Sequence, residues 1–169
     1  QFDPRDRMWG GKLSVTHNLG ETRSLWASLS RGFRAGGFNI GTSVPADRQS
    51  FEPEYLWNLE LGWKGSAEAQ RQSGDLNLFY TRREHQQVAT SIQLDPEDPL
   101  TFLYLTDNAA SGEAWGVEGS ARKQVTAQLE LSSTLSLMRS RYLDYQYGSR
   151  DLDGRAWAHA PELKVAVAA

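Results

Sequence analysis

The sequence predicts an all-β protein built as an antiparallel up-and-down meander of about seven strands. Two observations carry this prediction. Apolar and polar side chains alternate with a period of two along several stretches, as in strands that have one apolar and one polar face. The connections alternate between short turns and long loops, and if neighbouring strands are antiparallel, every long loop lies at one end of the sheet.

The first two predicted strands, residues 9–18 and 23–33, are joined by a tight turn. Apolar and polar residues alternate along both strands. In the second strand, however, Trp26 falls on the polar face and Arg31 on the apolar face. We attribute this irregularity to a β-bulge at Gly32, because a bulge redirects the side chains around it.

The third strand, residues 55–64, has the most regular alternation in the chain. Its apolar face carries aromatic rings at both ends and leucines between them: Tyr55, Trp57, Leu59, Leu61 and Trp63. A strand that crosses a bilayer is built in this way, because amphipathic rings are most stable at the level of the headgroups. A soluble sheet also fits the pattern.

The fourth, fifth and sixth strands, residues 75–92, 108–123 and 127–145, exceed the roughly 9 to 11 residues that a tilted strand needs to cross a bilayer. The apolar face of the fourth strand becomes polar from Arg82 onward, and that of the sixth becomes basic from Arg139 onward. This change indicates strands that leave the hydrocarbon and continue into water.

The long loops are predicted at residues 34–54, 93–107 and 147–161, and a seventh strand follows at 162–169. Long loops at one end and short turns at the other are typical of bacterial outer-membrane barrels. No run of about 18 apolar residues is present, so the sequence predicts no transmembrane helix. The chain begins at Gln1 without a leader pattern, and we interpret it as a fragment.

Composition and motifs argue against several classes of function. The 169 residues carry a formal net charge of -3, which does not suggest a nucleic-acid partner. The chain has no cysteine, and His17, His85 and His159 lack metal-ligand spacing, so no metal site is predicted. The acidic residues 95–98 lack the pattern of a calcium loop. No nucleophile elbow or phosphate-binding loop is present, and we predict that the protein is not an enzyme.

Several short motifs resemble those of one family, the TonB-dependent outer-membrane receptors. The matching segments, in chain order, are SRGFRAGGFN at 30–39, FEPE at 51–54, NLELGWK at 58–64, LNLFY at 76–80, QV at 87–88, NAA at 108–110, GVE at 116–118 and HAPE at 159–162. Their order and spacing extend over nearly the whole chain. They resemble the C-terminal part of the barrel domain in that family.

This resemblance implies a segment of a 22-stranded transmembrane barrel in the bacterial outer membrane, closed by an N-terminal plug. Residues 1–169 would be a partial barrel domain without the plug and the final strands. The implied function is import of a scarce ligand, a ferric siderophore above all, powered through TonB. The implied partners are outer-membrane lipid, the plug, TonB through a missing N-terminal region, and the small-molecule iron chelate, with no bound cofactor.

Two sets of residues follow as candidate sites. External loops on a rigid scaffold usually carry recognition residues, and those suited to an anionic chelate are Arg34, Asn39, Arg48, Tyr104 and Arg150. The polar faces of the strands would face the lumen or the plug through Asn58, Glu60, Glu118, Ser120, Gln128 and Glu130. Each of these residues is alternatively a solvated polar side chain.

Two other classes of protein remain open. A passive porin or channel has the same kind of strands without a plug. A soluble β-sandwich that binds a ligand would pack its leucine and tryptophan faces on each other. The loss of apolar character toward the long loops argues against the sandwich, because a two-layer core keeps its inner faces apolar.

Overall fold

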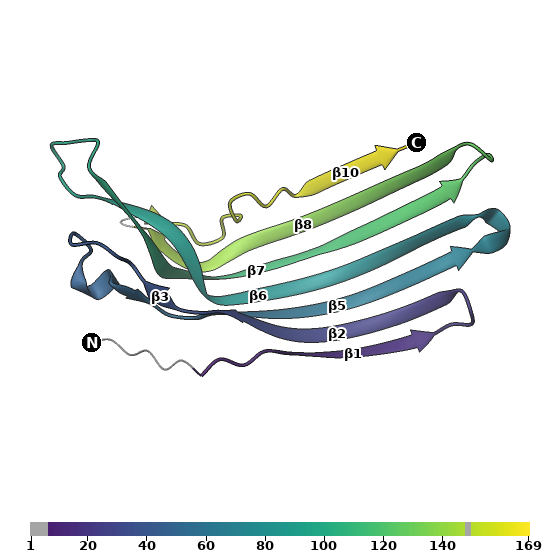
Figure 1. Ribbon diagram of the computed structural model, residues 1–169, viewed down its shortest axis with the longest axis horizontal. Helices are drawn as coiled ribbons and strands as arrows, with labels where there is room; N and C mark the ends of the chain where they lie inside the picture. The colour runs from purple at the N-terminus through teal and green to yellow at the C-terminus, as the bar shows by residue number, and fades with distance from the viewer. Residues whose placement is uncertain (1–6, 148–149) are drawn as a thin grey trace.

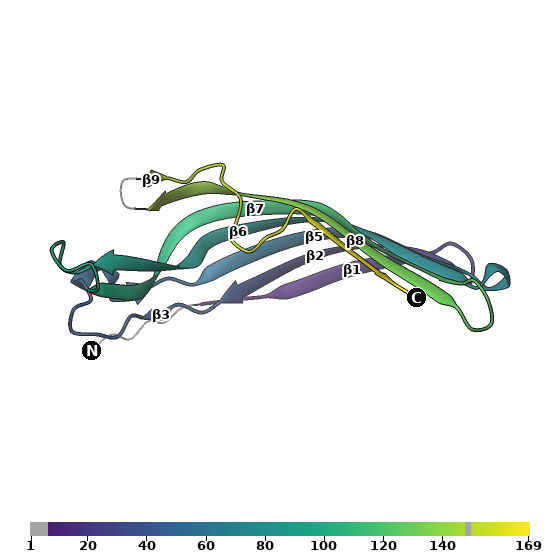
Figure 2. The same ribbon diagram turned by 90° about the horizontal axis from the view of Figure 1, so that it is seen from above.

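A computed structural model describes residues 7–147 and 150–169. The described chain forms one curved sheet in which each long strand pairs antiparallel with its neighbour in the sequence (Figures 1 and 2). The strands of the meander are β1 (Gly11–Asn18), β2 (Arg23–Arg34), β5 (Glu54–Ala67), β6 (Gln72–Gln93), β7 (Phe102–Gln124), β8 (Glu130–Tyr147) and β10 (Leu163–Ala168). The predicted antiparallel meander of seven strands is confirmed.

The smaller elements lie in the connections. The β2–β5 loop contains the two-stranded pair β3 (Gly37–Phe38) and β4 (Ser50–Phe51), with a 3-10 turn at Ala46–Arg48. A second 3-10 turn, Glu68–Gln70, joins β5 to β6, and β9 (Arg150–Asp151) pairs with β8. The long loops gather at one end of the sheet and the short turns at the other, as predicted (Figure 1).

Several predicted boundaries were wrong. The loop predicted at 93–107 is reduced to 94–101, because β6 and β7 continue as a hairpin beyond the apolar stretch. The sixth strand begins at Glu130 and not at residue 127, so Gln128 lies in a turn. Strand β5 is longer than predicted at both ends. Alternating hydrophobicity marks only a stretch with one apolar and one polar face, and it misses residues 102–105, where apolar side chains occur on both faces.

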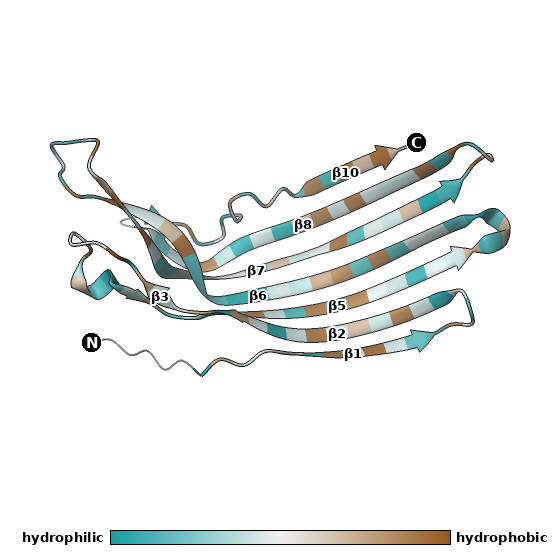
Figure 3. Ribbon diagram, viewed as in Figure 1, coloured by the Kyte–Doolittle hydropathy of each residue, from teal (hydrophilic) through white to brown (hydrophobic). Residues whose placement is uncertain are grey.

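One face of the sheet, which we call the leucine face, is covered by three apolar rows that run across the strands. The central row is continuous in register: Val15, Ala27, Leu61, Leu78, Val117, Leu137 and Leu163. No second layer covers these rows in the part of the chain that the structure describes, and Leu59 and Leu61 remain 45% and 50% exposed. Figure 3 shows the alternation as apolar segments between polar ones along β2, β5, β6 and β8.

The opposite face, which we call the polar face, carries the side chains between these rows. Its irregular residue Trp26 lies over Gly62 of β5, where a Cβ would be 2.1 Å from the indole ring. The predicted bulge at Gly32 was wrong, because Arg31, Gly32 and Phe33 pair with β5 without interruption. Arg31 instead lies on the leucine face, 4.2 Å from the ring centroids of both Trp9 and Tyr55. Aromatic rings therefore accommodate a charge at the edge of the apolar rows.

A bulge does occur in β6. The register with β7 shifts between Arg83 and Gln86, and His85 adopts a φ of 52°. Beyond this point β6 and β7 continue toward the long loops. Within the described residues, no helix has the length and apolar character needed to cross a membrane.

Candidate functional site

The polar face in the middle of the sheet is a wall of side chains that are hydrogen-bonded in pairs between neighbouring strands. Ser28 of β2 donates to the Glu60 carboxylate at 3.0 Å, and Thr81 of β6 donates to Asn58 Oδ1 at 2.7 Å. Because each acceptor already has a partner on the next strand, the wall is polar without depending on a further ligand.

The same arrangement continues on the later strands. Ser136 donates to Glu118 at 3.1 Å, and the Ser120 hydroxyl donates to Asp75. Glu130 forms an ion pair with Arg122 at 3.5 Å near the short-turn end. Of the six residues predicted to face the lumen, Asn58, Glu60, Glu118, Ser120 and Glu130 share the polar face. Gln128 lies in the β7–β8 turn and does not belong to the strand wall.

The long-loop end contains a network centred on Glu54, which is 4% exposed. Glu54 accepts from Arg83 Nε at 2.6 Å and from the backbone N–H of Gln87 at 2.9 Å. The Gln87 amide donates in turn to the carbonyl oxygens of Ala35 and Glu52 at 2.9 and 3.0 Å. The bulge in β6 exposes the Gln87 N–H, and the buried Glu54 carboxylate accepts from it while the Arg83 guanidinium balances the negative charge.

Two asparagines fasten the β2–β5 loop to β7. Asn39 donates to the carbonyl oxygens of Arg48 and Thr106 at 2.8 and 2.7 Å and accepts from the Thr106 N–H at 2.8 Å. Asn108 donates to the carbonyl oxygens of Glu52 and His85, both at 2.9 Å. Both side-chain amides are thus hydrogen-bonded within the protein. They hold the β2–β5 loop, which we call the ledge, against the sheet.

The five residues predicted to bind a ligand have different environments. The Asn39 side chain is hydrogen-bonded to backbone groups of the ledge and of β7, and Arg48 forms an ion pair with Asp107 at 3.5 Å. These two residues lie together beside β7. Tyr104 is 79% exposed on β7, whereas Arg34 and Arg150 are exposed on β2 and β9. The structure therefore brings two of the five together and leaves three exposed at the same end of the sheet.

Sequence reasoning missed Trp157, which follows β9 and covers the polar face of β7. The Trp157 indole packs against Gly112, where an added Cβ would lie 2.6 Å from Nε1. The centroid of the indole ring is 5.3 Å from the guanidinium carbon of Arg83. The Trp157 Nε1 is buried and has no hydrogen-bond partner in the described structure. The sequence signal for this contact was Gly112, because a glycine within a strand indicates the close approach of another group.

Two tyrosines near the end of β8 have pKa values that are shifted from the usual tyrosine value. Tyr147 donates to the Ser91 carbonyl oxygen at 2.9 Å, and hydrogen bonds with Ser91 and Thr90 lower the pKa of Tyr147. Burial raises the pKa of Tyr145, and the neighbouring Tyr142 adds to that effect. These contacts connect β8 to β6 across the end of β7.

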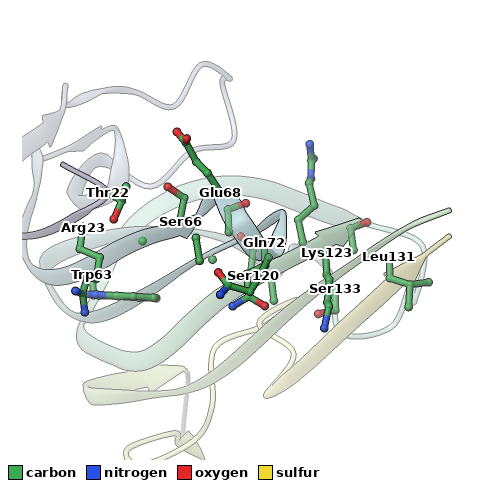
Figure 4. Close-up of a pocket in the computed structure, with 18 of the residues that line it drawn as sticks. Thr22, Arg23, Trp63, Ser66, Glu68, Gln72, Ser120, Lys123, Leu131 and Ser133 are labelled. Carbon is green, nitrogen blue, oxygen red and sulfur yellow. The ribbon is translucent and has the colours of Figure 1, made fainter. Parts of the chain in front are cut away.

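An open hollow of about 990 Å³ lies at the short-turn end (Figure 4). Its lining includes Trp63, Ser120, Lys123 and Leu131. Of the predicted site residues, only Ser120 is part of this lining among the residues described. Within the same residues, no group of three or more histidine, aspartate or glutamate side chains is arranged to hold a metal ion.

Solved structures share this architecture. The ferric yersiniabactin uptake receptor from Yersinia pestis superposes on 92% of this chain with a TM-score of 0.71 at 19% identity, and the match covers 22% of the receptor. The ferripyoverdine receptor of Pseudomonas aeruginosa matches 92% of this chain and 19% of its own length, with a TM-score of 0.61 and 17% identity.

A third structure, the ferric-catecholate import receptor of Escherichia coli K12, also matches 92% of this chain, with a TM-score of 0.61 and 15% identity over 21% of the receptor. The chain thus spans about a fifth of the length of these receptors. The family profile described as "TonB dependent receptor-like, beta-barrel" matches residues 1–169. The chain therefore belongs to the TonB-dependent receptor family and forms part of its β-barrel.

Proposed function

We propose that these residues form part of the wall of a receptor that binds a ferric siderophore outside the cell and imports it with energy transmitted by TonB. Barrels of this family lie in the bacterial outer membrane, and its members are transporters rather than enzymes. In the complete protein a plug would fill the barrel. Residues 1–169 would then be a partial barrel domain.

One observation carries the proposal. A single sheet has an exposed leucine face on one side and a hydrogen-bonded polar face on the other, with the long loops gathered at one end. Lipid would cover the leucine face, and the plug or water would contact Asn58, Glu60, Glu118 and Ser120. Since these four side chains have hydrogen-bond partners on the wall, a plug could move away without leaving them unpaired.

The long-loop end is the proposed ligand entrance. Tyr104, Arg34 and Arg150 are exposed there and suit an anionic chelate. Asn39 and Arg48 would act by positioning the ledge, since their polar groups are already engaged. The chelate class is supported by the ligands named for the related receptors, for yersiniabactin, pyoverdine and catecholates.

The experiment is uptake of radioactive iron as ferric siderophores by cells that carry the complete receptor, with and without TonB. We expect uptake that requires both TonB and the proton-motive force. Exchange of Tyr104 and Arg150 for alanine should weaken siderophore binding while the barrel still folds. Uptake that is equal in cells without TonB would contradict the proposal and favour the passive channel.

A further inference from the structure

The open hollow of about 990 Å³ at the short-turn end is a depression in the leucine face (Figure 4). Its floor is a row of small residues that stand opposite one another on β5, β6, β7 and β8: Gly65, Gly74, Ala121 and Ser133. Because these side chains are so short, the backbone of four neighbouring strands is uncovered there. The rest of the leucine face is covered by larger apolar side chains.

Large apolar side chains border this floor. The Trp63 indole leans over Gly65, where an added Cβ would lie 2.4 Å from the ring. Leu131 and Val167 lie at the other end of the lining, and both are exposed. Such walls suit a hydrocarbon chain, because contact with it removes their apolar surface from water. A tryptophan at the end of apolar rows is also typical of the level at which hydrocarbon meets headgroups.

The rim of the hollow next to the short turns carries charges of both signs. Lys123 of β7 stands in register with Gln72 of β6. Gln72 pairs in turn with Ala67, the last residue of β5, and Glu68 follows in the 3-10 turn. One strand thus separates the acidic from the basic position, which corresponds to two strand spacings, or about 9.6 Å. Both side chains are exposed and line the hollow.

These two charges are not neutralised by the protein. Among the described residues, no ion pair involves Glu68 or Lys123. The neighbouring Arg122 is already paired with Glu130 at 3.5 Å. Arg23 borders the far end of the hollow, three strands from Lys123 or roughly 14 Å away. A small headgroup at this rim therefore meets one cation and one anion.

We propose that the hollow binds a phospholipid with a zwitterionic headgroup, in the leaflet next to the short turns. Lys123 would donate to the phosphate, and the lipid's ammonium group would donate to the Glu68 carboxylate. An acyl chain would lie over the small residues, between Trp63 and Leu131. Charge complementarity favours this class, because an anionic headgroup would place a second negative charge beside Glu68. The inference rests on the proposed contact between the leucine face and lipid.

The test uses the complete receptor in neutral detergent and three photoreactive lipids with identical acyl chains, each carrying a diazirine. The lipids are phosphatidylethanolamine, phosphatidylglycerol and diacylglycerol. Cross-linked peptides are identified by mass spectrometry, and labelling of the hollow is compared with labelling of the central apolar row in the same sample. We expect phosphatidylethanolamine to label peptides of β7 and β8 that line the hollow more strongly than the other two lipids do.

The variants separate the two charges. Lys123→Gln and Glu68→Gln should each reduce labelling of the hollow by phosphatidylethanolamine about fivefold, in line with the value of one charge at a membrane surface. Glu68→Gln should in addition increase labelling by phosphatidylglycerol, because the repelling carboxylate is gone. Labelling of the central row should not change in either variant, which shows that the barrel is intact.

Lys64→Gln and Glu21→Gln are the matched controls. Lys64 is exposed on the polar face at the same end, and Glu21 is exposed in the β1–β2 turn, outside the lining. Both should label as the wild type does. Equal labelling of the hollow by the three lipids, a preference for phosphatidylglycerol in the wild type, or equal losses in the controls would overturn the inference. Siderophore uptake is measured separately: a receptor that shows the lipid preference but imports nothing contradicts only the proposed function.

Discussion

The middle of the sheet and its long-loop end are stabilised in different ways. In the middle, backbone pairing holds the strands, the leucine face is open, and serine, threonine, asparagine and glutamate side chains pair between strands across the polar face. At the long-loop end, Glu54, Gln87, Leu105 and Tyr145 are buried, and side chains bind loop backbone. In the proposed arrangement a membrane supplies the apolar environment for the middle, whereas the end that enters water must build its own core.

The largest effect that separates the two regions is expected for Glu54→Ala. Removal of the Glu54 carboxylate leaves Arg83 and the Gln87 N–H without their buried partner, which should lower the free energy of unfolding by about 3 to 5 kcal/mol. Urea unfolding and hydrogen exchange of the complete receptor measure the loss, and the β2–β5 loop should exchange faster. Glu97→Ala, in an exposed loop at the same end, is the control and should change stability little. Equal effects of the two variants would disprove the buried network.

A charge in the middle of the leucine face should have the next largest effect. Leu61→Arg places a guanidinium group in the central apolar row, where lipid contact predicts a cost of about 2 to 4 kcal/mol. Unfolding in bilayers measures it. Leu100→Arg changes a loop leucine that is 88% exposed and should be neutral. A neutral Leu61→Arg would show that water and not lipid covers this row.

Gly62→Ala tests the close contact on the polar face. Its methyl group would lie 2.1 Å from the Trp26 indole, so the ring must shift, at a cost of about 1 to 3 kcal/mol. Gly32→Ala is the matched control, because open space surrounds that position in the same sheet. The midpoint of thermal unfolding should fall for the first variant only. Identical midpoints would mean that Trp26 does not occupy this position.

The smallest effect is expected for Ser136→Ala, which removes one hydrogen bond to Glu118. An exposed bond of this kind contributes about 0.5 to 1 kcal/mol. A double-mutant cycle with Glu118→Gln isolates the interaction. A coupling free energy near zero would indicate that the pair is separated in the complete receptor.

The alternation of apolar and polar residues was sufficient to predict the strands that have a leucine face. It also placed Asn58, Glu60, Glu118 and Ser120 on one face, because successive side chains in a strand point to opposite faces of the sheet. It failed for residues 102–107 of β7, where apolar residues occur on both faces and no alternation is left, and for Gln128, which lies just before β8 begins.

The role of Asn39 could not be predicted from local patterns. Its amide binds the backbone of Thr106, which lies 67 residues away in the sequence. Glu54, Gln87 and Asn108 belong to motifs that resemble the family, and they form the hydrogen-bond network that holds the β2–β5 loop against the sheet. Sequence resemblance located these residues, and only the long-range contacts explain their chemistry.

The most direct test of the account compares adjacent positions on β5 in the complete receptor in bilayers. This chain contains no cysteine, so Leu59→Cys, Leu61→Cys, Asn58→Cys and Glu60→Cys can each carry a spin label in this segment. We expect labels at 59 and 61 to collide with oxygen dissolved in lipid, and labels at 58 and 60 not to do so. Equal accessibility at all four positions, or contact of 59 and 61 with a water-soluble relaxation agent, would contradict the assignment of the leucine face to lipid.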